Sequence, residues 1–254
     1  MTTVVSIVSG KGGVGKTTTT LNLAAALAER DHYVTVVDGN LTTPNISLHL
    51  GIPLFPTTLH DVLQGKIDIT KAVYIHESGV RVVPASLSVE NLKGIKASDL
   101  QRALDPLVER KGWILLDGAA GLGKEARTVM RVSDTSIIVT NPEIPAVTDA
   151  LKAIKVANQI GTPVAGVIIN RWTGKKHQMT LNNIFEMLEK PILGVVPEDQ
   201  KIQECISQKK MFFHTHPQSR TAYRYRYIVS NILGQPYPRP TGLTGAFKRT
   251  FLNY

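Results

Sequence analysis

The sequence predicts an α/β fold, with a doubly wound, mostly parallel sheet and helices on both faces. Short runs rich in Val and Ile alternate with stretches of helical periodicity. The runs are continuously apolar and do not alternate with polar residues, which indicates strands buried on both faces. Alternation of strands with helices is typical of open sheets that bind ligands at the carboxyl ends of their strands.

The individual elements follow from this pattern. Strands are expected at residues 3–9, 33–38, 80–84, 113–117, 136–140, 164–170 and 192–196, and helices at 16–30, 97–110, 147–160 and 179–189. In the first helix, an apolar stripe at helical spacing is formed by Leu21, Ala24, Ala25 and Ala28. We find no internal repeat and no mid-chain linker, so residues 1–233 are expected to form one domain.

Composition excludes several classes of protein. A chain of 254 residues can bury about 70–75% of its unfolded surface, so it needs no disulfides. The single cysteine, Cys205, cannot form an internal disulfide or a Cys-rich zinc or iron–sulfur site. No apolar run approaches the ~20 residues of a spanning helix, and no basic segment precedes the first apolar run. We therefore expect a soluble, cytoplasmic protein.

The formal net charge of +9 is concentrated near the end of the chain. Residues 200–254 contain nine basic side chains and one acid, Glu204. Such a surplus favours a polyanionic partner, either nucleic acid or an anionic membrane, although a solubilising surface is an equally open interpretation. The interleaved residues 223–227 (Tyr-Arg-Tyr-Arg-Tyr) suit nucleic acid, but Ala222, Tyr225, Val229 and Ile232 favour an amphipathic helix with a basic outer face.

A phosphate-binding pattern lies near the start of the chain. Gly10-Lys-Gly-Gly-Val-Gly-Lys16-Thr17 fits G-x-x-x-x-G-K-[ST], between an apolar run and a helix, as the pattern requires. Its glycines let backbone N–H groups face phosphates, beside the positive end of the helix dipole. Lys16 is expected to neutralise β/γ oxygens and Thr17 to ligate Mg²⁺. The expected ATP-binding residues of this loop are Gly10, Lys11, Gly12, Gly13, Val14, Gly15, Lys16, Thr17 and Thr18.

The string KGGVGKTT, with its second lysine at Lys11, resembles the deviant Walker A motif of the MinD/ParA family of ATPases. The resemblance implies a P-loop NTPase fold, Mg²⁺-dependent hydrolysis of ATP to ADP, and a homodimer that sandwiches the nucleotides. It also implies that Lys11 reaches the ATP phosphates of the partner and stabilises charge there, as an arginine finger does. An iron–sulfur role like that of some relatives is disfavoured, because a single cysteine cannot supply paired ligands.

Later segments extend the resemblance over nearly the whole chain and are closest to MinD. Residues 38–46 resemble switch I, which opens with Asp38, and residues 114–121 resemble the Walker B and switch II segment, in which Asp117 ends a strand. With Thr17, these two carboxylates are the implied Mg²⁺ site. The implied adenine contacts are Asn170, Arg171, Pro197, Glu198 and Asp199, and Asp149 is the implied residue of the dimer or partner surface.

Two positions depart from the family pattern. Asn40 stands where the family usually has a second switch I acid that orients or activates the attacking water. The implied catalytic residues are therefore Lys11, Lys16, Asp38 and Asn40. An amide can hydrogen-bond a water but is no carboxylate base, so hydrolysis is expected to be slow. The sequence leaves open whether Asn40 is natural or a substitution that traps ATP. Ala119 replaces the proline that is usual in MinD switch II.

The end of the chain differs in composition. Residues 234–242 contain three prolines and predict an extended linker. In residues 243–254, Leu243, Phe247, Phe251 and Tyr254 share one helical face. The pattern predicts a membrane-binding amphipathic tail like that of MinD, and a tail packed on its own domain or without fixed structure stays the alternative. The expected membrane residues are Leu243, Phe247, Lys248, Arg249, Phe251 and Leu252.

Three functions are compatible with these features. The leading one is an ATPase switch that dimerises on ATP, attaches to the inner face of the cell membrane and positions division or other machinery through an unidentified activator or cargo. The second is a ParA-type partition ATPase that binds DNA nonspecifically. The third is a metabolic enzyme that activates a carboxylate with ATP, against which Lys11 argues because that residue serves a dimeric switch.

Overall fold

We analysed a computed structural model that describes residues 1–52, 54–87 and 97–237. The strands are β1 (Thr3–Ser9), β2 (Val34–Asp38), β3 (Tyr74–Ile75), β4 (Arg81–Val83), β5 (Trp113–Ala120), β6 (Thr135–Thr140), β7 (Val164–Trp172) and β8 (Ile192–Pro197). The helices are α1 (Lys16–Ala28), α2 (Ile46–Leu50), α3 (Leu59–Leu63), the 3-10 helix η1 (Ile69–Ala72), α4 (Ala97–Val108), α5 (Lys124–Arg131), α6 (Ile144–Ile160), α7 (Leu181–Leu188), α8 (Gln200–Ser207), α9 (Phe212–Thr215) and α10 (Arg220–Leu233).

The eight strands form one sheet in the order β3-β4-β2-β5-β1-β6-β7-β8. Only the short β3 is antiparallel to its neighbour, and all other pairs are parallel. The order reverses on either side of β1, which is the topological switch point of a doubly wound sheet. The predicted fold class is therefore confirmed, and the carboxyl end of β1 is the place where such a sheet binds its ligand.

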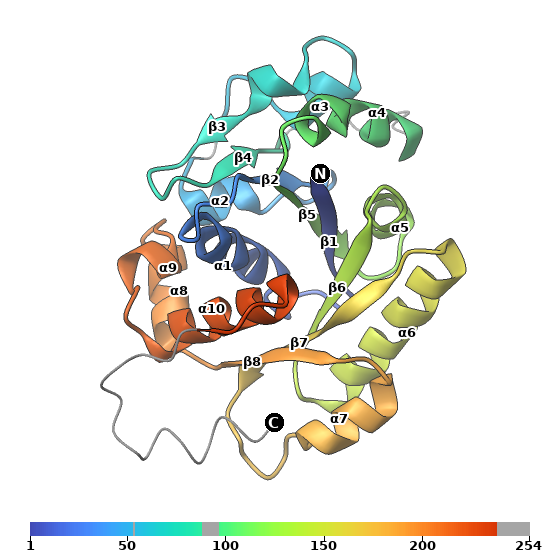
Figure 1. The fold of residues 1–254 in the computed structure, drawn as a ribbon, viewed down its shortest axis with the longest axis vertical. Coiled ribbons are helices and arrows are strands. Elements are labelled where there is room, and N and C mark those ends of the chain that lie inside the picture. Colours follow the sequence, from blue (N-terminus) through green and yellow to red (C-terminus); the bar gives the residue numbers. More distant parts are fainter. Residues whose placement is uncertain (53, 88–96, 238–254) are drawn as a thin grey trace.

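Helices cover both faces of the sheet and enclose two cores (Figure 1). Successive side chains of a strand point to opposite faces, so Val4 and Val8 of β1 enter one core whereas Val5 and Ile7 enter the other. The first core contains residues from α3 to α7, and the second contains residues from α1, α2, α8, α9 and α10. In Figure 1, α1 and α10 lie side by side over the second face.

The seven expected strands and four expected helices all appear, with boundary shifts of a few residues. The first helix ends at Ala28, two residues early, because the chain turns through Asp31 at φ 61° into β2. The amphipathic helix expected near Tyr225 is α10, and it ends at Gly234 in the left-handed conformation. The short elements β3, α2, α3, η1 and α9 were not expected, nor were α5 and α8.

The end of the chain is described only in part. The predicted linker, residues 234–242, is described as far as Tyr237, and the predicted tail, residues 243–254, lies outside the described residues. Among the residues that the structure does describe, no helix is both long enough and apolar enough to cross a bilayer.

Candidate functional site

The loop between β1 and α1 has a backbone that only glycine can supply at key positions. Gly13 and Gly15 have φ values of 75° and 91°, in the left-handed region. A Cβ on Gly15 would lie 2.2 Å from Asn170 Nδ2, and a Cβ on Gly10 would lie 2.0 Å from the carbonyl oxygen of Asp149. The loop therefore packs closely against the Asn170 side chain of β7 and the backbone of α6 at Asp149, and these contacts leave no room for a side chain at Gly15 or Gly10.

The start of α1 is open to an anion. Its cap, Gly15, offers no side-chain hydrogen bond, and its first turn contains no acidic residue. The first backbone N–H groups of a helix have no partner within the helix, and with the dipole they attract negative charge. Lys16 is the first residue of α1 and is 8% exposed. Burial lowers the pKa of its ammonium, against the opposing charges of Asp117 and Asp38.

Two buried carboxylates lie on neighbouring strands beside this loop, one at the end of β2 and one near the end of β5. Asp38 of β2 and Asp117 of β5 are paired in register. Asp117 accepts hydrogen bonds from the hydroxyls of Thr17, at 2.6 Å, and Thr20, at 3.1 Å. Asp38 accepts from the backbone N–H groups of Asn45 and Ile46, both at 3.1 Å, at the start of α2.

The electrostatics of this pair suit a divalent cation. Burial raises the pKa of the Asp38 carboxyl well above its ordinary value, and the charge of Asp117 raises it further. Burial likewise raises the pKa of Asp117, against the lowering effect of Lys16. Oxygen ligands from two carboxylates and the Thr17 hydroxyl are what Mg²⁺ prefers, with phosphate and water completing its shell. The residues present therefore fit Mg²⁺ bound together with a nucleotide.

The remaining loop lysine is placed differently. Lys11 is exposed, and the Ser9 hydroxyl donates to its backbone carbonyl at 2.7 Å. Within the described ranges, none of the salt bridges involves the Lys11 ammonium. It is a cation at the rim of the loop, directed outward.

Asn40 is engaged within its own loop, residues 38–46, which we call the switch I loop. Its Nδ2 donates to the Thr43 carbonyl at 2.5 Å, and its Oδ1 accepts from the N–H and the hydroxyl of Thr43 at 3.3 and 3.1 Å. Asn40 is 5% exposed. In this conformation both ends of the amide are used by Thr43.

The predicted adenine residues lie at the carboxyl ends of β7 and β8. Asn170 Nδ2 donates to the Val14 carbonyl at 2.7 Å, which ties β7 to the phosphate loop. Arg171 has φ 55°, and the N–H of Glu198, which follows Pro197, donates to the carbonyl of Trp172 at 3.1 Å. These residues are therefore brought together at one edge of the sheet.

Asp199 and Asp149 have partners of their own. The Asp199 carboxylate caps α8 by accepting from Lys201 N–H, and it also accepts from the Thr221 hydroxyl at 2.7 Å. Asp149 lies on α6, where its carboxylate pairs with Lys152 at 2.9 Å while its carbonyl abuts Gly10. The carboxylate of Asp199 is thus engaged in structural contacts, whereas Asp149 lies at the edge of the phosphate loop.

The structure adds residues that the sequence did not single out. Thr20 joins Thr17 on Asp117. His49 of α2 lies 3.4 Å from the Thr18 hydroxyl through Nε2, and its Nδ1 lies 2.9 Å from the Asn45 carbonyl. Glu125 of α5 accepts hydrogen bonds from Thr42. All three contacts join segments far apart in sequence, and the sequence carries no motif for them.

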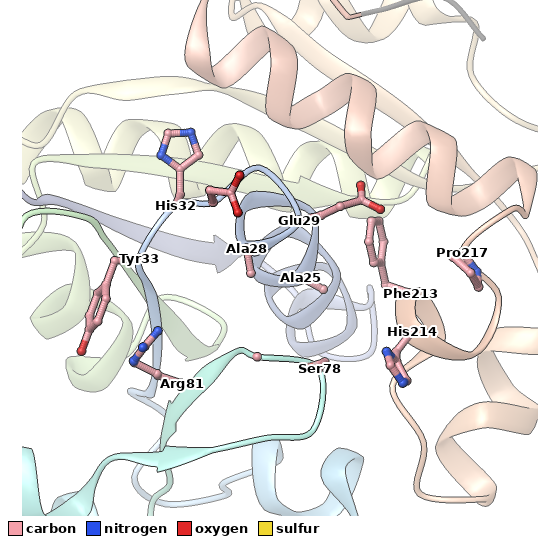
Figure 2. Close-up of a pocket in the computed structure, with 12 residues that line it drawn as sticks. Ala25, Ala28, Glu29, His32, Tyr33, Ser78, Arg81, Phe213, His214 and Pro217 are labelled. Carbon is pink, nitrogen blue, oxygen red and sulfur yellow. The ribbon is translucent and has the colours of Figure 1, made fainter. Parts of the chain in front are cut away.

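A separate cavity lies at the other end of α1 (Figure 2). It has a volume of about 630 Å³, with Ala25 and Ala28 of α1 in its lining. Across it, Arg81 of the β3–β4 hairpin lies 3.9 Å from the Tyr33 ring centre, and His214 comes from α9. Since the phosphate loop precedes the opposite end of α1, this cavity is distinct from the loop and its carboxylates.

One arginine of the interleaved segment, residues 223–227, is held in an ion pair. Arg226 makes a two-pronged ion pair with Glu29, at 2.6 and 2.7 Å, and its guanidinium lies 4.7 Å from the Phe213 ring centre. It is only 9% exposed. Arg226 therefore binds α10 to α1 and is not part of a surface for nucleic acid.

A glycine loop with a buried lysine, a helix start without a side-chain cap and two buried carboxylates on neighbouring strands define a P-loop site for a nucleotide and Mg²⁺. Residues 5–212 match the family described as the CobQ/CobB/MinD/ParA nucleotide binding domain, and the chain belongs to that family. Within it, the chain is a MinD/ParA-type ATPase, and ATP or ADP with Mg²⁺ is its cofactor.

Relatives of this chain are similar over nearly its full length. An ATP-binding protein of Methanocaldococcus jannaschii is 36% identical over 237 residues, which cover 93% of this chain and 90% of the relative. The structure of the cell division ATPase MinD of Pyrococcus furiosus is 34% identical, with a TM-score of 0.86, and the match covers 92% of this chain and 99% of that one. MinD of Pyrococcus horikoshii, solved with Mg-ADP, is 34% identical, with a TM-score of 0.85 and coverage of 91% and 96%.

Proposed function

We propose that this chain is a MinD-like molecular switch. ATP binding makes it dimerise and attach to the inner face of the membrane, where it positions division or other machinery with the help of a further activator or cargo. The observation that carries this proposal is the complete phosphate loop with an exposed, outward lysine at its rim. Lys16 is sufficient to bind the phosphates of the nucleotide in its own chain. A second, exposed lysine at the rim of the loop is therefore available for the nucleotide of a partner.

The surface around Lys11 supports a dimer on this face. Ile144, the first residue of α6, is 65% exposed, and Asp149 of the same helix abuts Gly10 of the loop. An exposed apolar side chain on the helix that abuts the phosphate loop suits a surface that a second copy covers. In such a dimer Lys11 would supply positive charge to the partner's phosphates as charge develops during transfer.

The remaining residues receive roles from their positions. Lys16 and the first-turn N–H groups of α1 would bind phosphate oxygens, and Thr17, Asp117 and Asp38 would hold Mg²⁺ directly or through water. Asn40 would orient the attacking water only after its amide leaves Thr43. An amide offers no general base, so we propose slow hydrolysis and a long-lived ATP state.

Membrane attachment would come from the predicted tail, residues 243–254, and its strength depends on pairing. Burying one Phe or Leu contributes ~1.5–3 kcal/mol and one cation near an anionic surface about 1 kcal/mol, whereas ordering each residue costs about 1–2 kcal/mol. A single tail should therefore bind marginally. Two tails in one dimer gain about a hundredfold or more from effective concentration. ATP would thus control attachment through dimerisation.

Co-sedimentation with anionic liposomes tests this proposal. Wild type, the Lys11→Ala variant and a deletion of residues 243–254 are compared with ATP and with ADP, in the presence and absence of competing DNA. We expect binding only for the wild type with ATP, and no effect of DNA. Equal binding by the deletion variant would refute the role of the tail, and equal binding with ADP would refute the switch.

A ParA-type function on DNA is the second candidate. It is favoured by Arg220 and Arg224, which line a groove of about 1150 Å³ between α7, β8 and α10. It is weakened by the commitment of Arg226 to Glu29. DNA binding that needs ATP, weakens with salt and survives deletion of the tail would favour this candidate over the membrane.

A further inference from the structure

The switch I loop is joined to α5 by one side chain from each. Thr42 donates twice to the carboxylate of Glu125, through its hydroxyl to Oε1 and through its backbone N–H to Oε2 at 3.4 Å. Glu125 is in the first turn of α5, shortly after the strand that ends with the buried Asp117 segment. The contact therefore joins the switch I loop to α5, the helix that follows the predicted switch II segment, and the two are far apart in sequence.

This contact is a polar link between the switch I loop and α5 at the point where a small cavity separates them. Glu125 takes part in none of the salt bridges of the described chain, so its two oxygens are directed to Thr42. Beneath the contact lies a cavity of about 120 Å³ lined by Leu41, Leu59, Leu100 and Thr128, among others. The start of the loop packs closely on α5, since a Cβ on Gly39 would lie 2.5 Å from Val129 Cγ1, but beside the cavity Thr42 is held against α5 by hydrogen bonds.

The link also fixes the orientation of Asn40. Thr42 is adjacent to Thr43, whose N–H, hydroxyl and carbonyl all bond the Asn40 amide. While Glu125 holds Thr42, the turn from residue 40 to 43 keeps Asn40 directed toward Thr43. An amide in that position has both oxygen lone pairs used by Thr43, so it cannot accept a hydrogen bond from a water that it should orient.

We propose that Glu125 is a positioning residue that latches the switch I loop shut and so limits the rate of ATP hydrolysis. The latch is the pair Thr42 and Glu125. It acts on Asn40 through Thr43, and turnover requires its release. This inference rests on the proposed function, because it takes Asn40 as the residue that orients water, and it adds a second control over that residue from the switch II side.

Steady-state kinetics test the latch in the full chain. The variants are Thr42→Val, Glu125→Gln and their combination, with Thr42→Ser as the conservative variant and Glu186→Gln, on the exposed side of α7, as the matched control. Loss of hydrogen bonds of this kind changes an equilibrium by about three- to tenfold, so we expect kcat to rise by about that factor with KM for ATP nearly unchanged. The combined variant should equal the single ones, and Thr42→Ser and Glu186→Gln should match the wild type.

Hydrogen exchange of the nucleotide-free protein separates the latch from the ATPase proposal. In Glu125→Gln, the amides of residues 40–45 should exchange faster than in the wild type, while those of β1 stay unchanged. This readout remains valid even if the wild type turns over no ATP, an outcome that would refute the proposed function alone. Unchanged exchange together with unchanged or additive effects on kcat would overturn the latch.

Discussion

The phosphate loop and the switch I loop flank the same two buried carboxylates but are held in place by different forces. The phosphate loop depends on backbone shape, since Gly15 has room for no Cβ beside Asn170 and Gly10 has none beside Asp149. The switch I loop depends on side-chain hydrogen bonds, from Asn40 to Thr43 and from Thr42 to Glu125.

This difference assigns nucleotide affinity to the phosphate loop and the rate of hydrolysis to the switch I loop. A backbone packed against two neighbours cannot rearrange without disturbing the sheet, so the phosphate loop is a fixed site for phosphate. Hydrogen bonds contribute a net ~1 kcal/mol each and exchange readily with water, so the switch I loop can change conformation with the nucleotide. Substitutions in the first region should change affinity, whereas those in the second should change rate.

The largest effect is expected from Gly15→Ala. The new Cβ would strain a left-handed φ and would displace Asn170 Nδ2 from the Val14 carbonyl, so the loop loses this tie and ATP affinity should fall by about a hundredfold or more. Isothermal titration with ATP and Mg²⁺ measures this. Gly65→Ala is the matched control, because Gly65 has φ 72° but nothing within 4 Å, and it should lower stability by about 1 kcal/mol while affinity stays at the wild-type value. If Gly15→Ala and Gly65→Ala lowered ATP affinity equally, the phosphate loop would have no special dependence on its backbone shape.

Asn40→Asp should change rate with little change in affinity. A carboxylate cannot donate to the Thr43 carbonyl, so one of the three bonds that hold residue 40 in the turn is lost, and the new group can act as a base. We expect kcat to rise by about fivefold or more, measured as phosphate release at saturating ATP. A rate equal to that of the wild type would exclude Asn40 as the cause of slow hydrolysis.

A smaller effect is expected at the junction of the two regions, from Asp117→Asn in the nucleotide-free protein. The folded state raises the pKa of Asp117, so it binds more protons than the unfolded state, and its ionisation lowers the free energy of unfolding as pH rises. The neutral amide avoids this loss. The variant should therefore gain stability relative to wild type as pH rises from about 4 to 7, and the gain should grow with pH. Urea unfolding at several pH values gives the difference in the free energy of unfolding between the variant and the wild type. A gain in stability that shrinks with rising pH would contradict a raised pKa of Asp117 as its cause.

The sequence was sufficient for the fold and the phosphate loop because both depend on local patterns. Apolar runs marked the strands, and the glycines with Lys16 and Thr17 are consecutive residues with a known spacing. The elements α2 and α9 escaped prediction because four or five residues carry too little periodicity, and α5 because its eight residues have a narrow apolar face of Ala126, Val129 and Met130.

The contacts that regulate the site were beyond the sequence for a different reason. Asn40 was singled out for its chemistry, but its bonding to Thr43 depends on the turn that the chain adopts. The Thr42–Glu125 contact and the His49–Thr18 contact join separate segments, and the spacing of residues along the sequence does not predict such contacts. Arg226 was placed in a basic surface from its neighbours in sequence, whereas Glu29, which binds it, comes from α1.

The central claim, that ATP controls the association of this chain through Lys11, is tested most directly by sedimentation velocity. Wild type and Lys11→Ala are compared with Mg-ATP and Mg-ADP at a concentration where ADP leaves the wild type monomeric. The account predicts a wild-type dimer with ATP and a Lys11→Ala monomer with ATP that still binds the nucleotide. A Lys11→Ala variant that dimerises as fully as the wild type, or a wild type whose association ignores the nucleotide, would contradict it.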